Sequence, residues 1–246
     1  MSITTVVFDF GNVVGFFSHR KAAEQLAAYG GASAEAIHAY LFGGRLEEDY
    51  EAGRLSTAAL IGMVRARFHL SCTDGEFKTA FADIFTPNPD VCTLVPALKK
   101  RPYRLVLLSN TNELHARQFL RQFAGTLGHF DALVLSHEVG LRKPDPRVFA
   151  ECQRRAGARA PAECLFLDDL PTNVDAARAC GWHGLVYRRG DDLRRRLAEF
   201  GVALPPLSEV RGQRSEVRSP RSSTDDTEEG EKRVGPVASG RRSDDS

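Results

Sequence analysis

Short apolar runs alternate with amphipathic segments along most of the chain. The apolar runs are rich in Val, Leu and Phe and are nearly continuous, as expected for parallel strands that are buried on both faces. They lie at residues 4–10, 104–109, 132–136, 164–168 and 184–187. The helix-like segments between and after the later runs lie at 113–123, 146–156, 172–180 and 191–200. This alternation predicts an α/β fold with a doubly wound, Rossmann-like parallel sheet.

The stretch from residue 19 to residue 85 has a different pattern. It holds no convincing strand, and its apolar residues recur at helical spacing over 20–29, 33–41, 57–68 and 75–84. An all-helical block after the first strand is expected to fold as a small inserted helical bundle that caps the sheet. We therefore predict a core formed by residues 1–18 and 86–204 and a cap formed by residues 19–85.

The last part of the chain, residues 205–246, changes character again. No aromatic residue follows Phe200, and Ser, Arg, Asp, Glu and Gly dominate. Such a segment cannot bury enough apolar surface to offset the entropy that it would lose on ordering. We expect a disordered, charged tail.

Composition narrows the classes of partner. The sequence holds 33 Lys and Arg against 32 Asp and Glu, so its charge favours neither nucleic acid nor an anionic membrane as a partner. No apolar run reaches the roughly 18–20 residues of a membrane-spanning helix, and the first run carries Asp9 rather than the uninterrupted apolar region of a signal peptide. The five cysteines include no Cys-x-x-Cys pair. We interpret them as reduced thiols and expect a cytoplasmic protein.

Polar residues stand at or just beyond the ends of four predicted strands. In an open α/β sheet, ligands bind beyond the carboxyl ends of the strands. We therefore expect one carboxylate, one hydroxyl, one amine and a pair of carboxylates to meet at one edge of the sheet. The residues concerned are Asp9, Ser109, Asn110, Lys143, Asp168 and Asp169.

The same stretches carry the motifs DFGNV, SNTNELH, GLRKPDP and DDLPTN, in that order. Together they resemble the four motifs of the haloacid dehalogenase-like (HAD) superfamily, and the resemblance covers roughly residues 3–200. The pattern is most similar to that of the bacterial α-D-glucose-1-phosphate phosphatases, whose cap element is also similar to YEAGRLS at 50–56. The resemblance implies a HAD core with a helical cap and a phosphatase that forms an aspartyl-phosphate on Asp9.

The chemistry of these residue types agrees with such a reaction. A carboxylate nucleophile divides phosphate ester hydrolysis into two easier steps through a covalent intermediate. Mg²⁺ prefers oxygen ligands, and Asp9, the backbone carbonyl of Gly11 and Asp169 can supply the protein's share of them. The resemblance implies that Asp168 is an outer-sphere partner of the metal rather than a direct ligand.

Other residues are predicted to bind the phosphoryl group or to support the site. Lys143 neutralises the phosphoryl group and Asp9, and Ser109 hydrogen-bonds the equatorial oxygens together with backbone N–H groups. Asn173 orients the loop after the fourth strand, and Asn12 is a further supporting residue. The N–H groups are those near Phe10, Gly11 and Asn110.

Gly11 is the largest departure from the superfamily's pattern. Most of its phosphatases carry a second Asp at this position, and general acid–base catalysis typically contributes about 10²–10⁴-fold. The glucose-1-phosphate phosphatase subgroup shares the glycine. Without a positioned acid, substrates with better leaving groups are favoured, so sugar 1-phosphates suit the site better than 6-phosphates. A cap residue, a water or Asn12 can take over the missing role.

We therefore expect a Mg²⁺-dependent phosphatase acting on a small phosphorylated metabolite. The cap arginines at positions 20, 45 and 54 are candidates for selecting the substrate. Two alternatives stay open. One is a catalytically weak or inactive HAD-fold protein that binds or regulates, with Gly11 as the trace of the lost chemistry. The other is a 2-haloacid dehalogenase, which the paired carboxylates at 168–169 disfavour because that reaction uses no metal.

Overall fold

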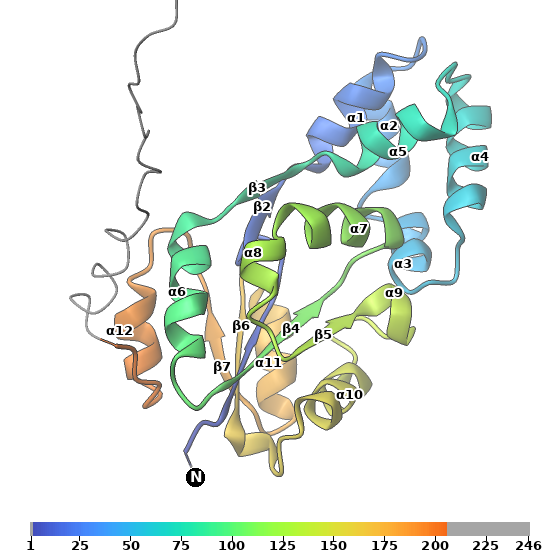
Figure 1. Ribbon diagram of the computed structural model, residues 1–246. Coiled ribbons are helices and arrows are strands. Elements are labelled where there is room, and N and C mark those ends of the chain that lie inside the picture. The colour runs from blue at the N-terminus through green and yellow to red at the C-terminus, as the bar shows by residue number, and fades with distance from the viewer. Residues whose placement is uncertain (1, 206–246) are drawn as a thin grey trace, which may run out of the picture.

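Five parallel strands form one sheet in the computed structural model, which describes residues 2–205 (Figure 1). The strand order is β5-β4-β1-β6-β7, and every neighbouring pair is parallel. The predicted α/β fold with a doubly wound sheet is thus confirmed. The predicted tail at 205–246 lies outside the described residues except for Pro205. The strands are β1 (Thr5–Phe8), β4 (Arg104–Ser109), β5 (Ala132–Leu135), β6 (Cys164–Asp168) and β7 (His183–Val186).

Helices surround the sheet and fill the insertion. Five of them lie between the first strand and residue 85, beyond one end of the sheet (Figure 1). These are α1 (His19–Ala27), α2 (Ala34–Leu41), α3 (Arg45–Glu51), α4 (Thr57–Phe68) and α5 (Asp74–Ala82). The others are α6 (Pro89–Lys99), α7 (Glu113–Gln122), α8 (Ala124–Leu127), α9 (Ser136–Val139), α10 (Pro146–Ala156), α11 (Pro171–Ala179), α12 (Leu193–Ala198) and the 3₁₀ turn η1 (Pro161–Glu163).

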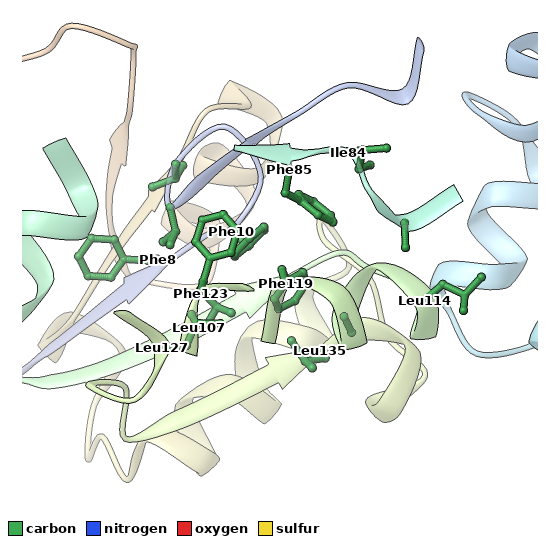
Figure 2. Packing of buried hydrophobic residues seen from close by; sticks show 14 of the residues in the cluster. Phe8, Phe10, Ile84, Phe85, Leu107, Leu114, Phe119, Phe123, Leu127 and Leu135 are labelled. Carbon is green, nitrogen blue, oxygen red and sulfur yellow. The ribbon is translucent and has the colours of Figure 1, made fainter. Parts of the chain in front are cut away.

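Both faces of the sheet are buried. Successive strand residues point to opposite faces, so Phe8 and Leu107 join one apolar cluster while Val7 joins another. The first cluster includes Phe119 of α7, which lies beside Phe10 (Figure 2). The second packs under α10 and α11 and includes Trp182. The near-continuous apolar strands of the sequence are explained by this burial on both sides.

Side-chain caps explain where most of the inserted helices begin. The hydroxyls of Ser18, Ser33 and Ser56 accept hydrogen bonds from the first turns of α1, α2 and α4. Thr73 and Glu76 form a capping box at the start of α5. Such caps satisfy backbone N–H groups that have no partner within the helix. The helix predicted over 57–68 is observed with those bounds, and the others differ by one or two residues.

Several short or irregular elements were not predicted. The antiparallel strands β2 (Gly15–Phe17) and β3 (Phe85–Pro87) carry the chain into and out of the insertion. The α3 segment buries only Tyr50, so it has no apolar stripe. Helix α6 contains Pro96 in its interior, and a proline there usually argues against a helix. We propose that the chain divides as predicted, into a core of 1–18 and 86–204 and a cap of 19–85, with β2 and β3 as the connection.

Gly53 lies where the turn after α3 meets α9. Its φ of +69° is in the left-handed region, and a Cβ atom there would collide with the carbonyl oxygen of His137. We expect Gly53→Ala to lower the free energy of unfolding by about 2 kcal/mol or more, because backbone strain and a collision add. Gly43→Ala is the matched control, since Gly43 has a φ of +79° and open space around it. Urea unfolding measures the free energy of unfolding of both variants. Equal losses of stability in the two variants would show that the collision at Gly53 has no effect of its own.

No helix within residues 2–205 is long and apolar enough to cross a membrane.

Candidate active site

The polar residues predicted at the strand ends meet at the carboxyl edge of the sheet. Phe8 of β1 is in register with Leu107 of β4 and with Leu167 of β6. The next residue, Asp9, donates its backbone N–H to the carbonyl of Leu167 at 2.8 Å. The ends of three neighbouring strands therefore present their polar side chains to one another. The loop after α9 adds Lys143 to this group.

Lys143 is the centre of the cluster. Its Nζ lies 2.6 Å from Oδ1 of Asp9, 2.7 Å from Oδ2 of Asp168 and 3.0 Å from the carbonyl oxygen of Leu108. All three ammonium protons thus have an acceptor, and the residue is 3% exposed. Burial lowers the pKa of Lys143, but the carboxylates of Asp9 and Asp168 more than offset this and raise it. The side chain is a buried, permanent cation.

Asn110 holds the backbone at Lys143. Its amide nitrogen donates to the Lys143 carbonyl at 2.9 Å, and its amide oxygen accepts from the Lys143 N–H at 2.8 Å. The sequence predicted a phosphate-binding role for the backbone near Asn110; the structure shows that its side chain positions the lysine. Ser109 lies beside it, 3% exposed, with only a long 3.4 Å hydrogen bond from Oγ to the Asn110 carbonyl. The Ser109 hydroxyl therefore retains capacity to bind another group.

The two neighbouring aspartates differ in how their oxygens are used. Asp168 is completely buried and accepts from Lys143, from Asn173 Nδ2 at 3.1 and 3.0 Å, and from the Leu170 N–H at 2.8 Å. Asp169 is half-buried, and its Oδ2 accepts from Asn12 Nδ2 at 3.0 Å. Asp168 thus has its acceptor capacity filled by protein donors, whereas Asp169 has oxygen to spare.

The carboxylates outnumber the cations in this cluster. Oxygens of Asp9, Asp168 and Asp169 lie within 4.8 Å of one another, so three negative charges against one positive charge leave two in excess. Burial raises the pKa of Asp9 to about 7; Lys143 opposes the rise, and the other two carboxylates add to it. Burial also raises the pKa of Asp169. This excess charge on oxygen atoms fits a divalent, oxygen-preferring cation such as Mg²⁺.

The space beside Gly11 is filled by an aromatic ring. A Cβ atom on Gly11 would lie 2.9 Å from Cε1 of Phe17, closer than carbon atoms normally approach. The preceding residue, Phe10, is buried and stacks on Phe119 with ring centroids 4.0 Å apart. Asn12 has a φ of +55° and turns the chain back toward β2. The packing of the loop after Asp9 therefore depends on position 11 having no side chain.

A cavity of about 230 Å³ opens onto the cluster. The lining includes all of the predicted site residues except Phe10, Ser109 and Asp168. Phe10 and Ser109 line an adjoining cavity of about 60 Å³. The sequence did not predict the other residues that line this cavity. Three of them lie inside the quoted motifs, but the resemblance assigned no role to those positions, and the other three lie outside the motifs. The missed residues are Phe17, His19, Glu47, Glu51, Arg142 and Leu170.

One expectation about the wider site is not met. The three cap arginines suggested as substrate selectors do not line this cavity; each pairs with an acid on the surface instead. A larger cavity of about 420 Å³ is lined by Tyr50, Glu113 and His137, among others, and by none of the predicted site residues. The smaller cavity is the candidate active site, because it alone of the two opens onto the buried cluster.

Comparisons with known proteins agree with this assignment. The sequence pattern of the haloacid dehalogenase-like hydrolases matches residues 3–181. The chain is 28% identical over 213 residues to Phosphatase MT3486 of Mycobacterium tuberculosis, covering 83% of this chain and 98% of that protein. It is 28% identical over 202 residues to D-ribitol-5-phosphate phosphatase of Bacteroides thetaiotaomicron, covering 79% and 97%.

A solved structure has the same fold. It is the HAD family enzyme bt-2542 of Bacteroides thetaiotaomicron in complex with magnesium and inorganic phosphate, with a TM-score of 0.69 and 22% identity over 79% of this chain and 99% of that one. Because the family's pattern extends over residues 3–181, from before β1 to beyond α11, the chain belongs to the haloacid dehalogenase-like hydrolases.

Proposed function

We propose that this protein is a Mg²⁺-dependent phosphatase that hydrolyses a small phosphorylated metabolite through an aspartyl-phosphate on Asp9. The observation that carries the proposal is the buried Lys143, bonded to both Asp9 and Asp168 at the edge of the sheet. Relatives named as phosphatases support it. The five cysteines are all free thiols, which agrees with the cytoplasmic location that we also propose.

The metal is assigned to the side of the cluster with spare oxygen atoms. Asp9, Asp169 and the backbone carbonyl of Gly11 would hold Mg²⁺, and Asp168 supports them from outside because its oxygens are engaged. The bound ion supplies positive charge that offsets the repulsion between the nucleophile and the phosphoryl group.

The protein's own groups divide the remaining work. An oxygen of Asp9 attacks phosphorus, and the bond from phosphorus to the ester oxygen breaks as the new one forms. Lys143 orients Asp9 and neutralises charge on the phosphoryl oxygens. The Ser109 hydroxyl and the backbone N–H groups of Gly11 and Asn110 donate hydrogen bonds to those oxygens, where charge spreads in the transition state. Water then cleaves the aspartyl-phosphate and restores Asp9.

The substrate is proposed to be a sugar 1-phosphate, as in the glucose-1-phosphate phosphatases that the motifs resemble. An anomeric hydroxyl is a better leaving group than an ordinary alcohol, which suits a site with glycine at position 11. The cavity of about 230 Å³ fits a small leaving group. Among the described residues that line it, the cations Arg142 and Lys143 are both paired with acids. A leaving group without a second negative charge is therefore favoured.

A phosphatase screen with and without Mg²⁺ tests the proposal. We expect phosphate release from a small sugar phosphate that stops when EDTA removes the metal, and a higher kcat/KM for a 1-phosphate than for the matching 6-phosphate. Equal values for the two isomers would reject the 1-phosphate assignment alone. Turnover no greater than that of Asp9→Asn would favour the inactive binding protein, and metal-independent halide release from chloroacetate would favour the dehalogenase.

A further inference from the structure

The insertion brings acids to the cavity opposite the glycine. Glu47 and Glu51 of α3 and His19 of α1 line the cavity that contains Asp9 and Gly11. The core has no side chain at position 11, and the Phe17 ring occupies the adjoining space. A carboxylic acid that replaces the missing one is therefore sought on the other wall of the cavity.

Glu51 is the acid that the core holds in place. Its backbone carbonyl accepts a hydrogen bond from Ser136 Oγ at 2.6 Å. Its Oε2 lies 2.9 Å from Nε and 2.7 Å from Nη2 of Arg142. Both ends of the residue are thus anchored to the core, although Glu51 belongs to the insertion. The side chain is 12% exposed and lines both the 230 Å³ cavity and the adjoining smaller one.

The second oxygen of Glu51 is free to act. Both contacts with Arg142 fall on Oε2, and within residues 2–205 no donor is hydrogen-bonded to Oε1. Glu47 differs in how it is held. Its Oε2 accepts from the Gly43 N–H at 2.7 Å, a contact within the insertion, and its Oε1 lies 3.7 Å from His19 Nδ1. Glu51 is instead held by Arg142 of the core, and it lines both cavities, whereas Glu47 lines only the larger of the two.

The charges around Glu51 suit a group that gains and loses a proton. Burial raises its pKa to about 7; Arg142 opposes the rise, Glu47 adds to it, and Lys143 opposes it. His19 faces the same cavity, and burial lowers its pKa to about 4, so it is neutral near pH 7. A general acid and base works best when its pKa lies near the working pH.

We propose that Glu51 is the general acid and base of the reaction, supplied by the insertion in place of a carboxylate at position 11. This inference rests on the proposed phosphatase function. In the first step Asp9 bonds to phosphorus, the ester bond breaks, and Glu51 Oε1 gives its proton to the departing oxygen. In the second step water bonds to phosphorus, the bond to Asp9 breaks, and the Glu51 carboxylate takes a proton from that water. One proton leaves Glu51 and one returns in each cycle.

The test compares two leaving groups in Glu51→Gln. An alkoxide needs a proton to depart, whereas p-nitrophenolate departs without one. We expect kcat for a sugar phosphate to fall by about 10²-fold or more. With p-nitrophenyl phosphate we expect a burst of p-nitrophenol at the wild-type rate, followed by slow turnover, because only the second step still needs Glu51. The wild-type decline in kcat above pH 7 should disappear in the variant.

Two further variants separate proton transfer from a structural role. Glu48→Gln removes a charge from the same helix and from the neighbourhood of the same arginine, with a 3.8 Å contact on a side chain that is 57% exposed; its kcat should stay within about twofold of wild type. Arg142→Gln keeps the Glu51 carboxyl but removes its cation. We expect its alkaline limb to move to higher pH, which supports the assignment even if Glu51→Gln fails to fold.

Each contrary outcome has a distinct meaning. Sugar phosphate turnover by Glu51→Gln within twofold of wild type would overturn the role of Glu51 while leaving the phosphatase intact. If Glu51→Gln slows the burst with p-nitrophenyl phosphate as much as it slows the sugar phosphate reaction, Glu51 only holds the insertion against the core. That outcome would also overturn its role in proton transfer. An unmoved alkaline limb in Arg142→Gln would count against Glu51 as the titrating group. A wild-type protein that turns over neither substrate would overturn both proposals together.

Discussion

Asp9→Asn is expected to lower kcat for any phosphate ester by about 10⁴-fold or more, because an amide cannot form the covalent phospho-intermediate. The substitution keeps the shape of the side chain. It also removes one of three crowded carboxylates. Because burial holds the pKa of Asp9 at about 7 in the folded protein, above its ordinary value of 3.8, the ionised form opposes folding above that ordinary value, and fully so above pH 7.

The loss of activity should therefore not be accompanied by a loss of stability. We expect the Tm of metal-free Asp9→Asn at pH 8 to be no lower than that of the wild type, and the rise in Tm on adding Mg²⁺ to be smaller. Calorimetry with and without Mg²⁺ measures both. Asp175→Asn, at an exposed ion pair with Arg178 on α11, is the control and should keep wild-type kcat. Substantial turnover by Asp9→Asn would mean that another group attacks phosphorus.

Lys143→Met is expected to lower the free energy of unfolding by about 3–5 kcal/mol in the absence of metal. The methionine has a similar length but no charge, so Asp9, Asp168 and the Leu108 carbonyl each lose a donor. Removing one partner of a buried ion pair leaves the other charges without compensation, and this is why the cost is large. We also expect kcat to fall by about 10²–10³-fold, as when one donor to a developing oxyanion is removed.

Lys99→Met provides the comparison. Lys99 Nζ lies 2.6 Å from Oδ1 of Asp131, as short a contact as that between Lys143 and Asp9, but Lys99 is 36% exposed. An exposed pair contributes at most about 1 kcal/mol. Urea unfolding of the two variants at one pH isolates the effect of burial. Similar losses would show that the buried cluster gains little from its lysine.

The strand-end residues illustrate how much of the site is encoded locally. Each apolar run predicted a strand of the sheet, and a polar residue at the end of a run was predicted to lie at the end of that strand. Parallel strands bring their carboxyl ends to one edge, so Asp9, Ser109 and Asp168 came together without knowledge of the packing. Lys143 lies in a loop after α9, and there the motif rather than the strand pattern pointed to it. The structure adds that Asn110 clamps the lysine backbone.

The insertion illustrates what local pattern does not encode. Helix α3 buries a single residue, so its polar sequence shows no face by which to orient it. Glu51 meets Arg142 across 91 positions of sequence, and that contact depends on how α3 docks on α9 and the following loop. The same holds for Phe17 beside Gly11, since the ring reaches that space only because β2 pairs with β3.

The sequence by itself determined the sheet, its helical insertion and the acids at the edge of the sheet, because apolar periodicity records which faces are buried. It also identified Lys143, through its motif. Only the tertiary structure decided which wall of the insertion faces that edge. The orientation of the insertion depends on contacts between polar side chains that lie far apart in the chain. The residues next to such a side chain in sequence do not indicate which residue it contacts.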